Sequence, residues 1–272
     1  MKRMRQIAGF ILAVVIIFGL SGCQDKKKEE ATDQFNQAVA TVKKSNEEIQ
    51  SSVTNLQNLI DSKNSPLDAK TLDAATTAVT EAKAKIVEIP ELPSKTEEIQ
   101  AATEKLLKSA DNKSTLSDLQ AADDALSKSI KQMQQVTNPK EAFIVERLKG
   151  LPNVAGLEAV TEANDPNGQL NKQGGYTSTV YFESDLIDQS QLFGETIIEK
   201  GTDGGGAIEV YATVEDANKR NEYLSAFDGA GPINSGSHTV VGTVVIRTSN
   251  KLTGSQQKEM EKNIYNSLID LK

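Results

Sequence analysis

Apolar residues in the first half of the chain recur with the period of a coiled coil. From Phe35 they alternate at intervals of four and three residues, which places them in one narrow stripe along a helix. The stripe consists of Phe35, Val39, Val42, Asn46, Ile49, Val53, Leu56 and Ile60. It predicts a helix of about 30 residues, roughly 45 Å long. Asn46 is the polar member of the stripe. It could lie at a frayed edge or fix the register of the packed helices, and we favour the second role.

Turn formers and prolines bound the second helix. Residues 62–65 predict a turn, after which Pro66 suits the first turn of a helix. The apolar stripe returns over residues 72–89. It stops before Pro90 and Pro93, because proline removes a backbone donor and clashes with the preceding helical turn.

Two more helices are predicted, over residues 94–110 and from 115 to about 136, with Asp123 interrupting the second stripe. Short loops make successive helices antiparallel neighbours. Residues 31–136 therefore predict an antiparallel helical bundle or coiled-coil stalk. The charged residues 23–30 before it predict a short tether.

The pattern changes after residue 138. Nine of the ten aromatic residues beyond residue 24 lie here, between runs of turn formers. We predict helices over 140–149, 213–228 and 253–269, strands over 157–161, 176–182, 207–212 and 238–247, and a short edge strand over 196–198. This order predicts an α+β domain over residues 139–272, in which helices cover one face of an antiparallel sheet.

The amino terminus has the pattern of an export signal. Lys2, Arg3 and Arg5 precede an apolar run from Ile7 to Leu20. The run is 14 residues long, whereas a helix that crosses a bilayer needs roughly 20. A cleaved signal peptide is therefore favoured over an uncleaved signal anchor, which would give the same topology.

Leu20, Ser21, Gly22 and Cys23 close this run and resemble the lipobox of bacterial lipoproteins. The resemblance implies that signal peptidase II recognises the first three residues and cuts before Cys23, once the cysteine sulfur carries a diacylglyceryl group. Residues 1–22 would then be the signal peptide. The diacylglyceryl group supplies two acyl chains, such as palmitate, and two chains make an anchor stable where one alone is reversible. We therefore expect attachment to membrane lipid through diacylglyceryl-Cys23, on the extracytoplasmic face of the cell membrane.

Charge and composition narrow the function. The formal charge is −8, and removing a leader with three basic residues takes it to −11. An acidic surface argues against nucleic-acid binding. The single cysteine is assigned to lipid, which leaves no disulfide or thiol chemistry. The sequence has one histidine, no tryptophan and no nucleophile or cofactor motif. We therefore expect that the protein binds no metal ion or cofactor and is not an enzyme.

The most distinctive loop runs from residue 164 to 176 and ends at Tyr176. Its oxygen donors at the close spacing that calcium requires are Asn164, Asp165, Asn167 and Asn171. A β-turn explains the same residues, because Pro166 presets the first central backbone angle, and asparagine and glycine tolerate the conformations of the next two positions. An EF-hand would also need a glutamate at the end of the loop, where Gln173 stands instead. The turn is favoured, and a ligand or calcium loop is the alternative.

Other polar residues are weaker candidates. Arg220, Lys172 and Arg247 could gather an anionic ligand, although surface or ion-pair roles are favoured. His238 lacks the partner residues of a metal site or a catalytic triad, so a surface position at the start of a strand is favoured. Gly204–Gly206 precede a predicted strand instead of the helix that a phosphate loop needs, so they predict a bulge or turn.

A set of residues in the second half carries a further resemblance. They are Asn164–Asn167, Leu170, Lys172, Gly175–Thr177, Gly206, Ile208–Tyr211 and Arg220–Tyr223. The set resembles a C-terminal domain of uncharacterised lipoproteins from Gram-positive bacteria. The resemblance implies a lipid-anchored extracytoplasmic protein and transfers no functional residue.

Anchor, helical stalk and aromatic-rich domain together predict a structural or interaction protein of the cell envelope. Its partner would be an envelope protein or a wall polymer. The alternative is a ligand- or calcium-binding sensory module that uses the loop over residues 164–176.

Overall fold

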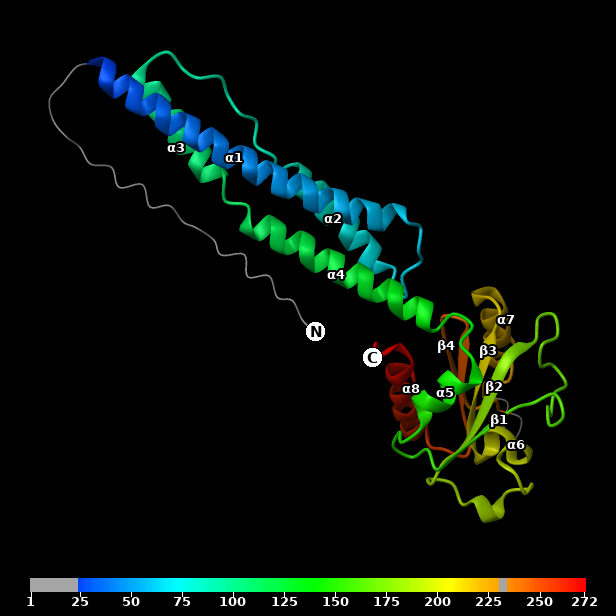
Figure 1. Cartoon of the computed structure of the whole chain (residues 1–272). Helices are drawn as coiled ribbons and strands as arrows, with labels where there is room; N and C mark the ends of the chain where they lie inside the picture. Colours follow the sequence, from blue (N-terminus) through cyan, green and yellow to red (C-terminus); the bar gives the residue numbers. More distant parts are fainter. Residues whose placement is uncertain (1–23, 230–233) are drawn as a thin grey trace. The chain divides into compact units, whose positions relative to one another are not determined.

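The computed structural model describes residues 24–229 and 234–272 (Figure 1). The leader and the four lipobox residues, Leu20 to Cys23, lie outside the described residues. By their contacts the residues form two units. One comprises the chain up to Glu48 together with Ile86–Lys113, and the other comprises Ile49–Lys85 together with Ser114–Lys272. The boundary predicted near residue 138 lies inside the second unit.

Four helices form where the apolar stripes predict them. They are α1 (Gln24–Asp61), α2 (Lys70–Lys83), α3 (Thr96–Ser109) and α4 (Lys113–Gln135). Two bounds differ from the prediction. Helix α1 already begins at Gln24, so residues 24–30, which were predicted as part of a tether, are helical. Helix α2 ends six residues before Ile89, and the chain then runs without regular structure to residue 93.

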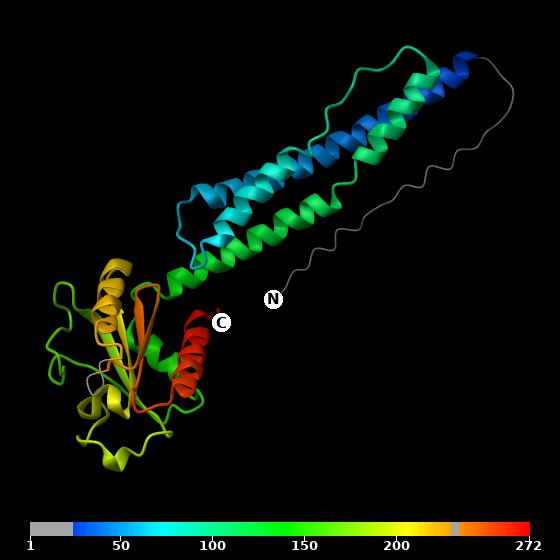
Figure 2. The same ribbon diagram turned by 180° about the vertical axis from the view of Figure 1, so that it is seen from behind.

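In the first unit, α3 packs beside the early part of α1 (Figures 1 and 2). The buried residues they share are Ala31, Phe35, Ala38, Val42, Ile99 and Leu106. Asn112, just after α3, donates from Nδ2 to the Ser45 carbonyl oxygen at 3.3 Å. The two helices therefore run in the same direction.

Asn46 has a defined partner in this unit. Its Nδ2 donates to the Val87 carbonyl oxygen at 2.8 Å, and its Oδ1 accepts from the Val87 N–H at 2.9 Å. Both hydrogen bonds must break if α1 slides along the segment after α2. Asn46 thus fixes a register, as its place in the stripe predicts.

In the second unit, the later part of α1 packs with α2 and α4. Their buried residues include Ile49, Val53, Leu56, Ala75, Val79, Ala82, Leu119, Leu126 and Ile130. The start of the α2 segment lies beside the later part of α4, because the Leu67 N–H donates to the Ser129 carbonyl oxygen at 3.1 Å. Helix α4 leads into the sheet, where the Thr243 N–H donates to the Val136 carbonyl oxygen at 3.0 Å.

The rest of this unit is built on one antiparallel sheet with the strand order β1-β2-β3-β5-β4. The strands are β1 (Gly156–Ala159), β2 (Tyr176–Glu183), β3 (Gly205–Tyr211), β4 (Ser237–Val241) and β5 (Val244–Thr248). The helices are α5 (Glu141–Leu148), α6 (Ile197–Lys200), α7 (Val214–Ser225) and α8 (Gly254–Ile269). The predicted α+β class, with a helical region before an antiparallel sheet, is confirmed.

Two predicted strands differ in the structure. Residues 238–247 form a hairpin, β4 and β5, because Gly242 takes a left-handed φ of 59° and reverses the chain. The predicted edge strand over 196–198 is the start of α6. Thr196 caps this helix, and Glu199 completes a capping box, so local hydrogen bonds favour the helical turn.

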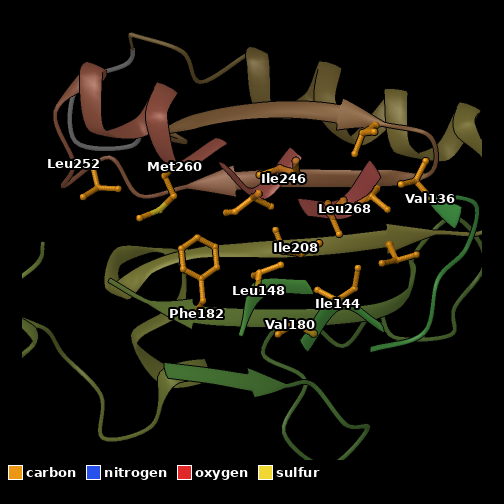
Figure 3. Packing of buried hydrophobic residues seen from close by; sticks show 14 residues of the cluster. Val136, Ile144, Leu148, Val180, Phe182, Ile208, Ile246, Leu252, Met260 and Leu268 are labelled. Carbon is orange, nitrogen blue, oxygen red and sulfur yellow. The ribbon is translucent and has the colours of Figure 1, made fainter. Parts of the chain in front are cut away.

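Helices cover both faces of the sheet, so the prediction of helices on one face is incomplete. Helices α5 and α8 bury the main apolar core with alternate residues of the central strands (Figure 3). Its members include Ile144, Leu148, Val180, Phe182, Ile208, Ile246, Met260 and Leu268. On the opposite face, α7 packs on Tyr176, Tyr211 and Val245, and α6 packs near Tyr181 and Ala207.

Candidate functional site

A buried carboxylate marks the sheet face beneath α7. Successive residues of β3 point to opposite faces. Ile208 and Val210 enter the core with α5 and α8, so Glu209 and Tyr211 point towards α7. Glu209 is only 1% exposed. A charge removed from water in this way requires partners.

Glu209 is held by two arginines and a tyrosine. Its Oε2 accepts from Arg220 Nε at 2.7 Å and from the Tyr211 hydroxyl at 2.9 Å. Its Oε1 accepts from Arg220 Nη2 at 3.0 Å and from Arg247 Nη1 at 2.7 Å. Arg220 on α7 therefore binds the carboxylate with two parallel hydrogen bonds, while Arg247 on β5 approaches from the neighbouring strand.

This arrangement sets the protonation of the cluster. Burial alone raises the pKa of Glu209, but the hydrogen bond from Arg220 and the charges of both arginines outweigh it, and the pKa is lowered. Burial, with the added charge of Glu209, raises the pKa of Tyr211 and of Tyr181. At neutral pH the cluster therefore holds one carboxylate, two guanidinium groups and neutral phenols, with a net charge of +1.

Two polar groups at this face have no hydrogen-bond partner among the described residues. One is Arg247 Nε, and the other is the hydroxyl of Thr179, a residue that is 1% exposed. Thr179 lies directly opposite Glu209 in the register of β2 and β3. The cluster thus keeps hydrogen-bonding capacity that Glu209 does not use.

The predicted loop adjoins this cluster, because Tyr176 lies opposite Tyr211 in the sheet. The Tyr176 hydroxyl donates to Asp165 Oδ1. The same oxygen accepts from the Asn167 N–H at 3.0 Å, and Asp165 Oδ2 accepts from the Leu170 N–H at 2.7 Å. Burial raises the pKa of Asp165, but these hydrogen bonds outweigh it and lower the pKa. Both carboxylate oxygens thus hold the loop closed.

The remaining loop residues also support the turn. The Gly168 N–H donates to the Asp165 carbonyl oxygen at 3.4 Å, which closes the predicted turn. Asn164 Oδ1 accepts from the Thr161 N–H at 2.6 Å, and Asn171 has a left-handed φ of 61°. Asn167 Nδ2 lies 3.5 Å from the Tyr176 hydroxyl. Asp165, Asn167 and Tyr176 therefore come together, while Asn164 and Asn171 shape the backbone elsewhere in the loop.

Replacing Asp165 with alanine is expected to lower the free energy of unfolding by about 2 kcal/mol, because three hydrogen bonds to its carboxylate are lost. Urea unfolding followed by circular dichroism measures the change. Glu162→Ala, at an exposed position nearby, is the control and should stay within about 0.5 kcal/mol of the wild type. If calcium raised the wild-type melting temperature and Asp165→Ala abolished that rise, the loop would be a calcium site.

The structure sorts the weaker candidates. Arg220 and Arg247 meet at Glu209, whereas Lys172 is exposed and outside the cluster. His238 on β4 has a buried side chain, with Nδ1 2.7 Å from Asn221 Oδ1 and Nε2 3.2 Å from Asp228 Oδ1. It links the edge strand to α7 and to the residues just after that helix, so the predicted surface position is wrong.

Sequence reasoning missed Glu209 and Thr179 as members of this site. The signal for Glu209 was present, since it is a charged residue in the middle of a strand whose neighbours are Ile208 and Val210. When both faces of a strand are buried, a charged side chain on it needs an oppositely charged partner nearby. Nothing in the sequence distinguishes Thr179 from other strand threonines, because its register with Glu209 appears only in the fold.

Comparison with protein families, with characterised proteins and with solved structures finds no match for this chain. Within residues 24–229 and 234–272, no helix is long and apolar enough to cross a membrane. The same residues contain no group of three or more His, Cys, Asp or Glu side chains placed to hold a metal ion.

Proposed function

We propose that this chain is a lipid-anchored extracytoplasmic protein with a structural or interaction role at the cell envelope. In this proposal Cys23 carries the lipid anchor, and the α+β domain binds an envelope protein or a wall polymer. The observation that carries the proposal is the run Leu20-Ser21-Gly22-Cys23 at the end of a basic and then apolar leader.

The buried cluster supports binding in preference to catalysis. A general base needs a free oxygen within reach of the substrate proton. Both oxygens of Glu209 are engaged by Arg220, Arg247 and Tyr211, and both oxygens of Asp165 are engaged by its own loop and Tyr176. These carboxylates therefore brace the fold, and the outer surface of the domain is left for partners.

Replacing Cys23 with alanine tests the anchor. We expect the variant to keep its leader and to lose lipid labelling, because alanine has no sulfur to take up the diacylglyceryl group that precedes the cut. Labelling cells with a palmitate analogue and comparing electrophoretic mobility measures both effects. A Ser21→Ala variant keeps the cysteine and a small residue before it, and it should be lipidated and cut like the wild type. If Cys23→Ala were processed and retained on membranes like the wild type, the proposal would fail.

A ligand-binding role for the loop is the second candidate. Arg247 Nε and the Thr179 hydroxyl, which have no hydrogen-bond partner in the part of the chain that the structure describes, favour it. Both groups lie on the same sheet face as Tyr176 and Tyr211. The two arginines outnumber the one carboxylate, which suits an anionic ligand more than calcium. Calcium is further disfavoured because Asp165 already has hydrogen bonds to both oxygens. Calcium binding by the loop is tested by the melting temperatures of the wild type and Asp165→Ala, measured with and without calcium.

A further inference from the structure

The loop over residues 184–196, between β2 and α6, displays an aromatic side chain to solvent. Phe193 is 97% exposed, and Leu186 in the same loop is 42% exposed. Other apolar side chains of this region are at least partly covered, since Ile187 packs on the main core and Ile198, in α6, is buried with Tyr181 and Ala207 of the sheet. The exposure of Phe193 is therefore not shared by the whole segment. In Figure 1 the loop is the yellow-green segment next to α6.

The first part of this loop is fixed by side-chain hydrogen bonds. Gln189 Nε2 donates to the Ser184 carbonyl oxygen at 3.0 Å and to the Gly204 carbonyl oxygen at 2.7 Å. Asp188 caps the short 3-10 turn after it, accepting from the Ser190 N–H at 3.1 Å. The chain that leads to Phe193 is thus tied to the start of β3.

The second part is fixed equally closely. Glu199 Oε2 accepts from the N–H groups of Glu195 and Thr196 at 2.8 and 3.1 Å. Gly194 has a φ of 111°, and a Cβ there would lie 2.8 Å from Glu199 Cβ. Only glycine suits this close approach. Phe193 therefore stands between two fixed segments, which lowers the entropy lost when such a side chain is buried by a partner.

The charge around Phe193 limits which partners can bind there. Asp185, Asp188, Glu195 and Glu199 are exposed, and no lysine or arginine occurs between residues 184 and 199. Such a surface is repelled by anionic lipid headgroups and by phosphates. A second copy of this chain is also disfavoured, since its formal charge is −8, or −11 without the leader. A protein with basic residues around an apolar pocket fits both the ring and the charge.

We propose that the 184–196 loop is the docking surface for a protein partner, with Phe193 inserted in an apolar pocket that is bordered by lysine or arginine. This inference rests on the proposed binding function and specifies its surface and partner class. Aromatic anchors surrounded by polar residues are typical of the few positions that dominate an interface.

Photo-crosslinking from position 193 tests the proposal. Benzoylphenylalanine is placed at Phe193 of the full chain in the cells that produce it, and at Tyr223 as the control. Tyr223 is 58% exposed on α7. We expect a protein adduct at 193 that is about tenfold stronger than at Tyr223, as for a central interface position. The adduct peptide should contain lysine or arginine, and the yield should fall in about 0.5 M salt, where charges are screened beyond a few Å.

A second variant separates charge from contact. Asp185→Asn, Asp188→Asn and Glu195→Gln together, in the crosslinking chain, should reduce the adduct at least about fivefold, because steering by the acidic residues is lost. An unchanged melting temperature shows that the loop still folds. The proposal is overturned if position 193 gives no adduct, or if its adduct is with lipid or with a second copy of the chain. It is also overturned if the adduct is insensitive to these changes. If Tyr223 captures a protein where 193 does not, the binding function stands and this surface is wrong.

Discussion

Replacing Glu209 with glutamine is expected to lower the free energy of unfolding by about 3 kcal/mol, because removing one member of a buried ion pair leaves the other charges uncompensated. The neutral amide accepts more weakly than the carboxylate, and its NH₂ group faces guanidinium donors. Arg220 and Arg247 have side chains that are 24% and 12% exposed, so they regain part of their hydration. The effect therefore lies near the lower end of the range for buried pairs. Urea unfolding at pH 7 measures it.

The matched control is Glu215→Gln on α7. Glu215 pairs with Lys219 at 2.8 Å, but both side chains are more than half exposed, at 77% and 64%. Such a surface pair contributes less than about 0.5 kcal/mol. If Glu209→Gln cost no more than this control, the buried cluster would have no role in stability.

The pH dependence provides a second readout of the same variant. The pKa of Glu209 is lower in the folded chain than in the unfolded one, where it is about 4.3. Its contribution is therefore fully present above the unfolded pKa and is lost as the pH falls through the folded pKa. We expect the difference between wild type and Glu209→Gln to narrow on acidification below about pH 4. A constant difference would contradict the assigned ion pair.

Replacing Gly206 with alanine is expected to cost about 3 kcal/mol, at the upper end of the range for an overfilled core. A Cβ at this position would lie 2.2 Å from the Arg247 carbonyl oxygen and 2.4 Å from Phe182 Cζ. The oxygen belongs to the backbone of β5, and Phe182 is fully buried in the main core. Neither neighbour can move without disturbing the sheet. The melting temperature and urea unfolding measure the loss.

Gly254→Ala is the control for this substitution. Gly254 is the first residue of α8, and a Cβ there meets nothing within 4 Å. The variant should be neutral or more stable by up to about 1 kcal/mol, because alanine loses less backbone entropy on folding. Equal effects of the two substitutions would show that close packing at Gly206 is not the cause.

The helical region was predictable because its signal is local and periodic. The stripe from Phe35 to Ile60 falls within one helix, and its members Phe35, Val42, Ile49, Val53 and Leu56 are buried. The spacing of apolar residues alone does not predict where the extended segment after α2 lies. Its contact with Asn46 depends on which residues lie beside α1, and a polar residue in a stripe does not identify its partner.

The sheet was harder to predict at its turns and at its second face. The run from His238 to Arg247 is so rich in valine that its composition favours one continuous strand, although Gly242 reverses the chain. Glu209, Arg220 and Arg247 are separated by up to 38 residues, and only the register of β3 with β5 and the packing of α7 on the sheet bring them together. The capping box of Thr196 and Glu199 is a local pattern that marks a helix start, whereas the partners of Glu209 depend on the fold.

The two outer strands of the sheet are short, four residues in β1 and five in β4. An outer strand offers unpaired backbone groups to any neighbouring chain, and its length limits how many new hydrogen bonds can form. Molecules confined to a membrane plane by the proposed lipid meet one another more often than molecules in free solution. Short edge strands then oppose edge-to-edge aggregation, so lipid-anchored molecules at high density would stay dispersed.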